Sequence, residues 1–127
     1  MRVIDSSGWI EFLMDGPGAD AYAPHVTAPD VLTPTIVVYE VYRIIRREAS
    51  EEDALTALAY LQTTTVVGLG MGLAMDAAEA SLEHGLAMAD AIVYATARQY
   101  GAELLTSDAD LAGLPGVTYI PKRPDLA

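Results

Sequence analysis

Short apolar runs alternate with longer stretches in which apolar residues recur every three or four positions, from one end of the chain to the other. The short runs are rich in Val, Leu, Ile and Thr, as in buried strands, whereas the longer stretches have the period of amphipathic helices. We predict strands over residues 2–5, 31–33, 63–67, 103–106 and 117–120. We predict helices over residues 8–14, 19–26, 35–48, 73–84 and 87–100, with a short turn or helix at 108–111. A further helix is predicted to open at residues 50–53 and to include Leu61.

Strands that alternate with helices indicate the α/β class, in which a parallel sheet is covered by helices on both faces and the crossovers are right-handed. A length of 127 residues is typical of one domain, and no repeat or linker divides the chain. We therefore predict a single domain over residues 1–127, with 121–127 as a loose tail.

Some residues are typical of helix ends and helix faces. Ser6 or Ser7 can cap the first predicted helix, and Ser50 with Asp53 forms a capping box before the fourth. The apolar residues of that fourth helix are Leu55, Leu58, Ala59 and Leu61.

The composition excludes several classes of function. The chain is 52% hydrophobic and 20% charged, which argues against disorder. It has no cysteine, so disulfides, cysteine-type zinc sites and thiolate catalysis are excluded. A signal peptide and an apolar run of about 18 residues, the length of a membrane helix, are both missing from the pattern. We expect a soluble, cytoplasmic protein.

The net charge is −11, from 18 acidic and 7 basic side chains. Such a charge repels phosphates and argues against loose, non-specific binding of nucleic acid. It fits a basic protein partner, or a site where cations offset carboxylates. A solvated acidic surface accounts for most of it.

Four acidic residues stand at comparable places in the predicted fold. Asp5 follows the first strand and Asp108 follows the fourth, whereas Asp90 lies in the first turn of a helix. Glu40 lies one to two turns into the helix that follows the second strand. In open α/β sheets, functional groups collect at the carboxyl ends of the strands, so these four acids can face one crevice.

Each of these acids also has a purely structural interpretation. Asp90 can complement the helix macrodipole, Asp108 can cap a turn, and Glu40 can pair with an arginine one turn along its own helix. Asp5 is harder to explain in this way. It ends a short buried strand, and a buried carboxylate needs a partner or a metal.

Carboxylates gathered in one pocket repel one another unless a cation relieves them or their pKa values rise. Ligand sets made only of oxygen suit Mg²⁺ or Mn²⁺, which activate water and stabilise the leaving oxygen of a phosphodiester. This chemistry needs no histidine, and His25 and His84 are isolated, so we interpret both as surface or packing residues. The acids therefore predict a divalent-metal site for phosphodiester cleavage.

The segments around these acids resemble the PIN-domain family, and within it the VapC-type ribonuclease toxins of toxin–antitoxin systems. The resemblance spans nearly the whole chain and is strongest in its second half. The matching segments are residues 3–7 (VIDSS), 38–42 (VYEVY), 89–97 (ADAIVYATA), 104–110 (LLTSDAD) and 114–117 (LPGV).

The resemblance implies a five-stranded parallel sheet in the order 3-2-1-4-5 and an endoribonuclease that depends on Mg²⁺ or Mn²⁺. Ser7 and Thr106 match supporting hydroxyl positions, which would orient the carboxylates. The family's acidic quartet, which holds the metal and carries the catalysis, falls on Asp5, Glu40, Asp90 and Asp108.

The match is incomplete next to the third and fourth acids. Met88 or Ala87 stands where the family has a hydroxyl before the third acid, and Leu111 stands where an aromatic often follows the last acid. Asp110 is an additional acid near the metal, and we expect it not to be a ligand.

The resemblance also implies RNA as the substrate, a homodimer, and a cognate antitoxin whose basic C-terminal segment lies over the acidic groove. Arg43 and Arg98 are candidates for holding RNA phosphates, together with Arg46 and Arg47. Salt bridges to nearby acids such as Glu48 are the alternative.

Trp9, Tyr39 and Tyr42 can stack on bases, although packing is the preferred interpretation. Two other functions stay open. A catalytically inactive PIN-like binding module would keep the shape without the chemistry, but all four acids are present. An Asp-nucleophile phosphatase usually has a second acid two residues after the first, where this chain has Ser7.

Overall fold

The computed structural model describes residues 1–122 and shows one parallel sheet in the order β3-β2-β1-β4-β5, as the resemblance predicted. The strands are β1 (Arg2–Ile4), β2 (Val31–Pro34), β3 (Thr65–Val67), β4 (Glu103–Thr106) and β5 (Val117–Tyr119). The helices are α1 (Ser6–Leu13), α2 (Ala19–Val26), α3 (Thr35–Glu48), α4 (Glu51–Leu61), α5 (Met71–His84), α6 (Met88–Gln99) and the short 3₁₀ helix η1 (Ala109–Leu111).

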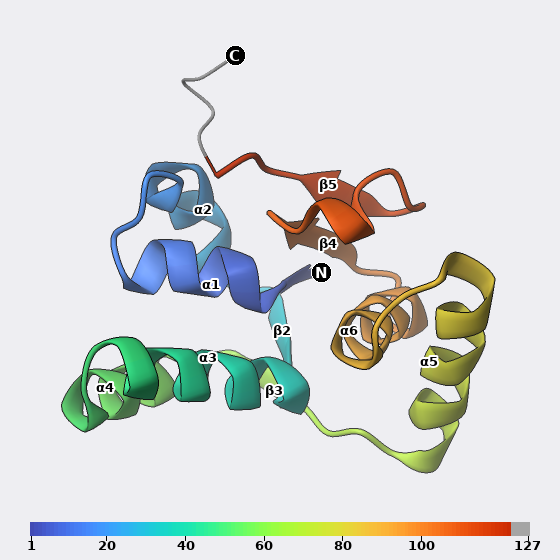
Figure 1. Cartoon of the computed structure of the whole chain (residues 1–127), viewed down its shortest axis with the longest axis horizontal. Helices are drawn as coiled ribbons and strands as arrows, with labels where there is room; N and C mark the ends of the chain where they lie inside the picture. Colours follow the sequence, from blue (N-terminus) through green and yellow to red (C-terminus); the bar gives the residue numbers. More distant parts are fainter. Residues whose placement is uncertain (123–127) are drawn as a thin grey trace.

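Helices cover both faces of the sheet, which confirms the predicted α/β class. Figure 1 shows α1 and α2 on one side of the strands and α5 and α6 on the other. Helix α6 packs across β1, β2 and β4, and α3 packs against α1 and β2. No helix within residues 1–122 is long and apolar enough to cross a membrane.

The register of the two central strands sets the level at which the candidate acids stand. Val3 of β1 pairs with Leu104 of β4, and Ile4 pairs with Leu105. All four side chains are fully buried. The backbone N–H of Asp5 continues this ladder by donating to the Leu105 carbonyl over 2.9 Å. β1 and β4 therefore end side by side, at the carboxyl edge of the sheet.

Helix α1 begins two residues earlier than predicted, and the prediction that a serine caps it is wrong. Asp5 occupies the N-cap position, and the helix starts at Ser6. Ser7 cannot cap the helix, because its hydroxyl donates to the Asp5 carboxylate and accepts from the Ser107 N–H. The cap that the sequence suggested is therefore used to join β1 to the end of β4.

The predicted strand over 63–67 is too long by two residues. The hydroxyls of Thr63 and Thr64 donate to the carbonyls of Tyr60 and Leu61, so both threonines close the end of α4. Their β-branched character suggested a strand, but these hydrogen bonds satisfy the last carbonyls of the helix instead.

Only part of the apolar set of α4 faces the core. The buried residues are Ala54, Ala57 and Leu61, whereas Leu55 is half exposed. Small alanines face inward because α4 lies directly along α3. The Ser50 cap is confirmed, since its hydroxyl accepts from the Asp53 N–H over 3.0 Å.

The remaining differences lie at element ends. Helix α5 begins at Met71 rather than 73, α6 covers 88–99 rather than 87–100, and β5 ends at Tyr119. The predicted loose tail over 121–127 lies largely outside the described residues.

Gly8 is required where α1 crosses α2, and a substitution there tests this packing. A Cβ on Gly8 would lie 2.7 Å from Tyr22 Cζ and 2.8 Å from Ile4 Cγ2. We expect Gly8→Ala to lower the free energy of unfolding by about 1–3 kcal/mol, as overpacking does in a tight core. Urea denaturation measures this loss.

Gly72→Ala is the matched control, because a methyl group at that position of helix α5 would have no other group within 4 Å. It should leave stability unchanged or raise it by up to about 1 kcal/mol. Equal stability of the two variants would contradict the crowding at Gly8.

Candidate metal centre

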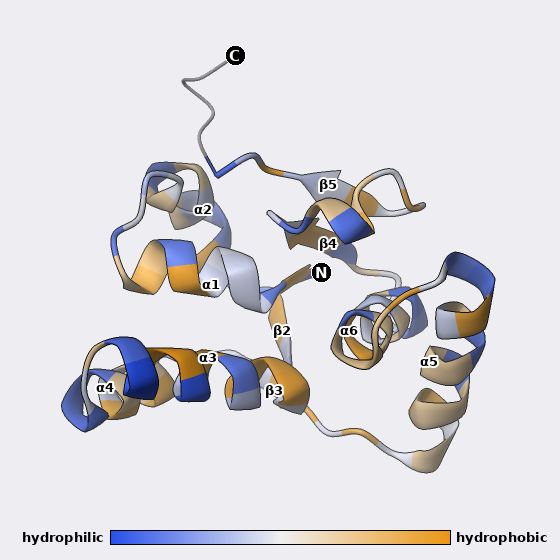
Figure 2. Ribbon diagram, in the orientation of Figure 1, coloured by the Kyte–Doolittle hydropathy of each residue, from blue (hydrophilic) through white to orange (hydrophobic). Residues whose placement is uncertain are grey.

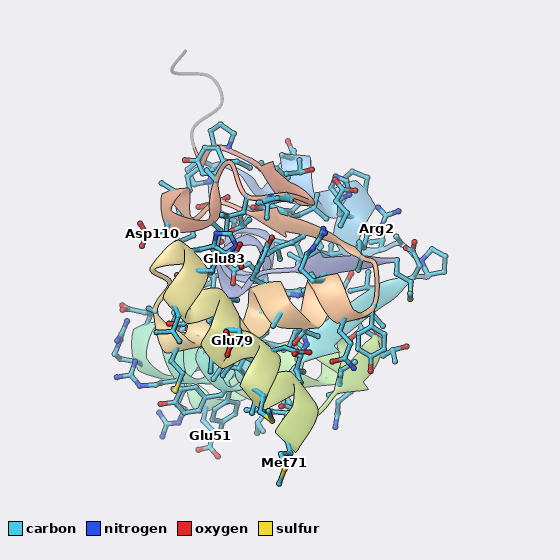
Figure 3. All side chains as sticks on the ribbon, turned by 90° about the vertical axis from the view of Figure 1, so that its right-hand side faces the viewer. Arg2, Glu51, Met71, Glu79, Glu83 and Asp110 are labelled. Carbon is cyan, nitrogen blue, oxygen red and sulfur yellow. The ribbon has the colours of Figure 1, made fainter. Side chains whose placement is uncertain are left out.

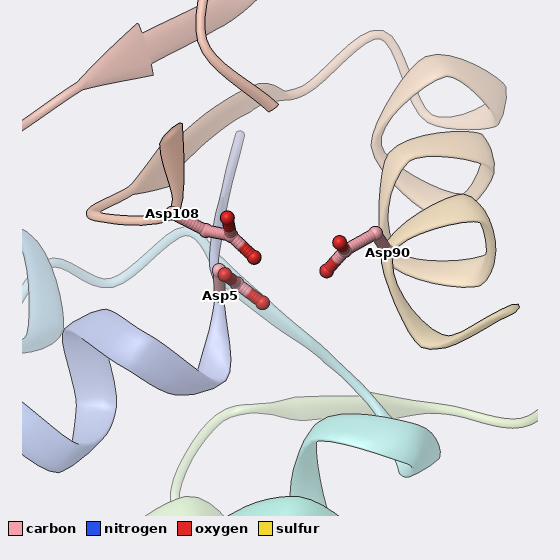
Figure 4. A group of neighbouring side chains, drawn as sticks. All are labelled: Asp5, Asp90 and Asp108. Atoms are coloured by element: carbon pink, nitrogen blue, oxygen red, sulfur yellow. The ribbon is translucent and has the colours of Figure 1, made fainter. Parts of the chain in front are cut away.

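Three of the four predicted acids meet at the carboxyl edge of the sheet. Asp5 follows β1, Asp108 follows β4, and Asp90 lies in the first turn of α6. One carboxylate oxygen from each lies within 4.8 Å of the other two. Figure 4 shows Asp90 directed from α6 toward Asp5 and Asp108. Three elements that are far apart in sequence thus share one small volume.

Hydroxyl groups fix the Asp5 carboxylate, which is only 3% exposed. Thr106 Oγ1 donates to Asp5 Oδ2 over 2.9 Å, and Ser7 Oγ donates to the same oxygen over 3.2 Å. Each hydroxyl has one proton, and a carboxylate only accepts, so both protons point at Oδ2. The 3.4 Å contact between Ser7 and Thr106 therefore has no proton to share. Oδ1 receives neither hydroxyl.

The same hydroxyls also position Asp108. Thr106 Oγ1 accepts from the Asp108 N–H over 2.9 Å, while Ser7 Oγ accepts from the Ser107 N–H over 3.0 Å. Asp108 then caps η1, because its Oδ1 accepts from the Asp110 N–H. The capping interpretation is correct, and it does not remove Asp108 from the carboxylate group. Ser7 and Thr106 lie where the resemblance implied supporting hydroxyls.

Tyr22 and Ser107 support this loop, and neither was identified from the sequence. Ser107 Oγ donates to the Ile120 carbonyl, so it accepts from the Tyr22 hydroxyl, 2.6 Å away. Burial raises the pKa of Tyr22 to about 12, which keeps the donated proton in place. Ser107 was recognisable as the residue before Asp108. No signal in the sequence links it to Tyr22 of α2.

Glu40 lies beside this group and not within it. It is half-buried on α3, one residue after the exposed Tyr39. Burial raises its pKa, the Ser6 hydroxyl opposes that shift, and the charges of Asp5 and Asp108 add to it. The three aspartates meet the distance expected of metal ligands without Glu40. Its assignment as a ligand stays a prediction.

Ionisation of all three carboxyl groups at once is unfavourable at this site. Burial raises the pKa of Asp5, and Asp108 adds to the effect, against the hydrogen bonds from Thr106 and Ser7. Burial also raises the pKa of Asp90 to about 7, with further contributions from the other acids, Asp108 first. Within residues 1–122, no basic side chain offsets these shifts. The arrangement is one in which either a proton or a cation lowers the repulsion.

The donor set fits a hard divalent cation. Three carboxylates from rigid elements supply oxygen alone, which favours Mg²⁺ or Mn²⁺ over Zn²⁺. Asp5 has an oxygen that neither hydroxyl occupies, and the three groups already lie at chelating distance. An ion there would have Asp5, Asp90 and Asp108 as ligands.

The residues that depart from the family pattern have structural explanations. Ala87 occupies the N-cap of α6 without a side-chain hydrogen bond, and Met88 is 72% exposed. Leu111 is fully buried in the core. Asp110 is exposed and lies outside the three-carboxylate group, and its role near a metal stays a prediction.

The two candidates for binding RNA phosphates lie at different distances from the acids. Arg98 is eight residues after Asp90 on the same helix, roughly 12 Å along its axis, and its guanidinium donates to the Pro115 carbonyl. This position does not favour a contact with substrate at the carboxylates. Arg43 lies one turn after Glu40 and is exposed. Arg47 forms the expected ion pair with Glu48, at 2.8 Å.

The aromatic and histidine residues divide between the core and the surface. Trp9 is fully buried and packs edge-on against Tyr60, which confirms packing over base stacking for this residue. Tyr39 is 62% exposed. His25 contacts Arg2 and His84 packs edge-on against Tyr94, so both are packing residues outside the carboxylate group.

A family comparison covers nearly the whole described chain. The model of the PIN domain family matches residues 2–117. That range includes all three clustered aspartates and Glu40. A search of curated proteins finds no significant match.

Solved structures with the same fold come from several bacteria. A toxin–antitoxin complex from Klebsiella pneumoniae matches with a TM-score of 0.79 and 24% identity, over 93% of this chain and 96% of that one. The sarcin–ricin loop cleaving toxin VapC20 of Mycobacterium tuberculosis matches with a TM-score of 0.72 and 20% identity, over 88% and 92%. VapBC2 from Rickettsia felis, bound to a DNA fragment from its promoter, matches with a TM-score of 0.73 and 12% identity, over 94% of this chain and 97% of that one.

The pKa of Asp90 generates a prediction for the metal-free protein. The folded chain holds the Asp90 proton up to about pH 7, whereas an ordinary aspartate has a pKa of 3.8. The free energy of unfolding should therefore fall as pH rises from about 4 to 7, and a divalent cation should restore it most strongly above pH 7. Thermal melts in EDTA and in MgCl₂ across this range measure both effects.

Asp90→Asn should have a flatter stability profile in EDTA and a smaller gain from Mg²⁺, because the titrating ligand is gone. Glu79→Gln, on an exposed position of α5 (Figure 3), should behave as the native protein does. If Asp90→Asn and the native protein have the same pH profile and the same gain, Asp90 is not part of a metal site.

Proposed function

Because this chain belongs to the PIN domain family, we propose that it is a divalent-metal-dependent endoribonuclease, acting as the toxin of a toxin–antitoxin pair. One observation carries the proposal: Asp5, Asp90 and Asp108 come from three separate elements and reach chelating distance. Purely structural roles for each acid would not require their carboxylates to meet. The proposed ion is Mg²⁺ or Mn²⁺.

The chain's own residues would do three things at this site. Asp5, Asp90 and Asp108 would hold the ion, with Glu40 as a fourth acid next to them. Ser7 and Thr106 keep Asp5 turned toward the site through hydrogen bonds to one oxygen. When bound, the divalent ion supplies charge stabilisation at the phosphate and activation of water.

RNA as the substrate is supported by the family and by one neighbour of the same fold, which is a toxin that cleaves the sarcin–ricin loop. An RNA substrate and a reducing environment, with which the absence of cysteine is compatible, fit a cytoplasmic enzyme. A non-catalytic binding module would not need the hydroxyl groups that orient Asp5.

An antitoxin is the proposed partner, because the neighbours include toxin–antitoxin complexes. The net charge of −11 and the acidic group at the edge of the sheet favour a basic segment as the part that covers the site. Such a segment would place cationic side chains among carboxylates that otherwise repel one another. Inhibition would then follow from occupation of the metal centre.

A homodimer is also proposed, and α5 is the surface that supports it. Met71, Met75, Ala78 and Leu82 follow one another at intervals of four, three and four residues, which is the spacing of a helix-pairing seam. Met71 is 84% exposed and Leu82 is 82% exposed. Figure 3 shows Met71 extending away from the body of the protein, and Figure 2 shows hydrophobic residues along most of α5. Since Leu73 and Ala77 of α5 are buried, this helix is apolar on two faces.

Asp5→Asn and Asp90→Asn test the proposed activity. Each replaces a ligand carboxylate by a neutral group of the same size, so we expect RNA cleavage to fall by at least about 100-fold. The assay is cleavage of a labelled RNA pool with Mg²⁺ or Mn²⁺ and with EDTA. Circular dichroism checks that both variants are folded.

Glu79→Gln is the control, since it removes one negative charge on α5 away from the carboxylates. It should cleave RNA at the native rate. Cleavage by both Asp variants at the native rate, or cleavage in EDTA, would show that the metal centre does not carry the activity.

Leu82→Glu tests the proposed dimer. A buried glutamate in an apolar helix pair is unfavourable, so light scattering after size-exclusion chromatography should change from the mass of two chains to that of one. Leu55→Glu is the matched control, because Leu55 is an exposed leucine on α4. A native chain that runs as a monomer would contradict the dimer.

A further inference from the structure

A wide groove lies along α3, with one residue of α4 in its wall. Its volume is about 620 Å³, and its walls carry both apolar and cationic groups. The lining residues are Val38, Tyr39, Tyr42, Arg43, Arg46, Arg47 and Leu58. All but Leu58 belong to α3, the helix that also holds Glu40.

The groove collects positive charge in a strongly acidic protein. It contains three of the seven basic residues of a chain with net charge −11. Within residues 1–122, neither Arg43 nor Arg46 forms an ion pair. Arg47 pairs only with its exposed neighbour Glu48, an arrangement that contributes little and is easily exchanged. These guanidinium groups have no evident role in holding the fold together.

Two tyrosines stand among these arginines. Tyr39 is 62% exposed and Tyr42 is half-buried, and they lie one helical turn apart. Exposed aromatic rings flanked by guanidinium groups suit unpaired nucleotides, because bases stack on the rings while the cations contact the phosphates. An apolar partner surface would leave the arginine charges unmatched.

The groove leads to the metal centre along one helix. Arg43 follows Glu40 by three residues, which is one helical turn. Tyr39, Tyr42, Arg43 and Arg46 recur at intervals of three, one and three residues, so these four lie along one side of the helix. Helix α3 starts at Thr35, directly after β2, and β2 is the parallel neighbour of β1, so the start of α3 stands at the same edge of the sheet as Asp5. A strand of RNA at the carboxylates could therefore continue along α3 without crossing the acidic remainder of the surface.

We propose that Tyr39, Tyr42, Arg43 and Arg46, here called the α3 track, bind single-stranded RNA beside the scissile phosphate. This inference rests on the proposed function and adds the surface that holds the substrate. The track restricts RNA to one path, because phosphates are repelled over most of a chain of net charge −11. Arg98, at the far end of α6, is not part of this path.

Fluorescence anisotropy with a labelled single-stranded RNA of mixed sequence, in EDTA so that it stays intact, tests the track. Arg43→Ala combined with Arg46→Ala should weaken binding by about tenfold or more and reduce the slope of log K against log salt by about 1.4, from about 0.7 for each phosphate contact. Tyr39→Ala should weaken binding by about tenfold with an unchanged salt slope, because it removes stacking only.

The matched control is Arg98→Ala combined with Lys122→Ala, which also removes two positive charges but leaves the track intact. It should retain most of the native affinity. An equal loss in the control would mean that binding follows net charge, and it would overturn the proposal. Native affinity in both track variants would overturn it too, and would leave the groove to a protein partner.

A kinetic measurement separates this inference from the proposed function. With cleavable RNA and Mg²⁺, track variants should raise KM and leave kcat near the native value, whereas Asp90→Asn should lower kcat. If no RNA is cleaved under any condition but the track variants still lose affinity, the proposed activity fails and the track stands. If RNA is cleaved and KM does not change in the track variants, the track fails alone.

Discussion

Repulsion among carboxylates that the sheet forces together is the constraint on which the functional end of this protein depends. β1 and β4 are neighbours and end at the same level, so Asp5 and Asp108 cannot separate without breaking the central ladder. Helix α6 packs across both strands and brings Asp90 to the same edge. The buried central strands thus hold together groups that would be more stable apart. A cation or a proton is needed to offset that cost.

Two hydroxyl groups determine which oxygen of Asp5 has its negative charge compensated. Ser7 and Thr106 both give their protons to Oδ2 of Asp5, and they use their lone pairs for the N–H groups of Ser107 and Asp108. The negative charge on one oxygen is thereby partly compensated, while the other oxygen has neither hydroxyl. The arrangement favours binding of a cation at the open side of the pocket. It also ties the orientation of Asp5 to the loop that carries Asp108.

Much of the fold could be predicted because its signals are local. The apolar runs at 103–106 and the stripe over 35–48 reproduce β4 and α3 to the residue, since buried strands and amphipathic helices each have their own period. The ends of elements were harder, because a hydroxyl has several possible partners. Thr63 and Thr64 bond to helix carbonyls rather than joining β3, and Ser7 bonds across the sheet rather than capping α1.

The candidate site, too, could be predicted only in part. Asp5, Asp90 and Asp108 were predicted to meet because the ends of parallel strands and the start of a helix share one edge of a sheet. How far Glu40 stands from them depends on the rotation of α3 about its axis, which its sequence does not determine. Tyr22 and Ser107 are 85 positions apart and meet through their side chains, so the pattern of hydrophobic and polar residues could not predict this contact.

Gly8 shows how far this site extends into the core. The Tyr22 ring lies against Gly8, in space that any Cβ would occupy, and from there its hydroxyl reaches Ser107 and supports the Asp108 loop. The absence of a side chain at Gly8 is therefore required for the contact that supports the acidic pocket from behind. Natural selection on activity can act at a position that has no side chain and touches no substrate, and relatives with a larger residue there would need a different brace behind their last aspartate.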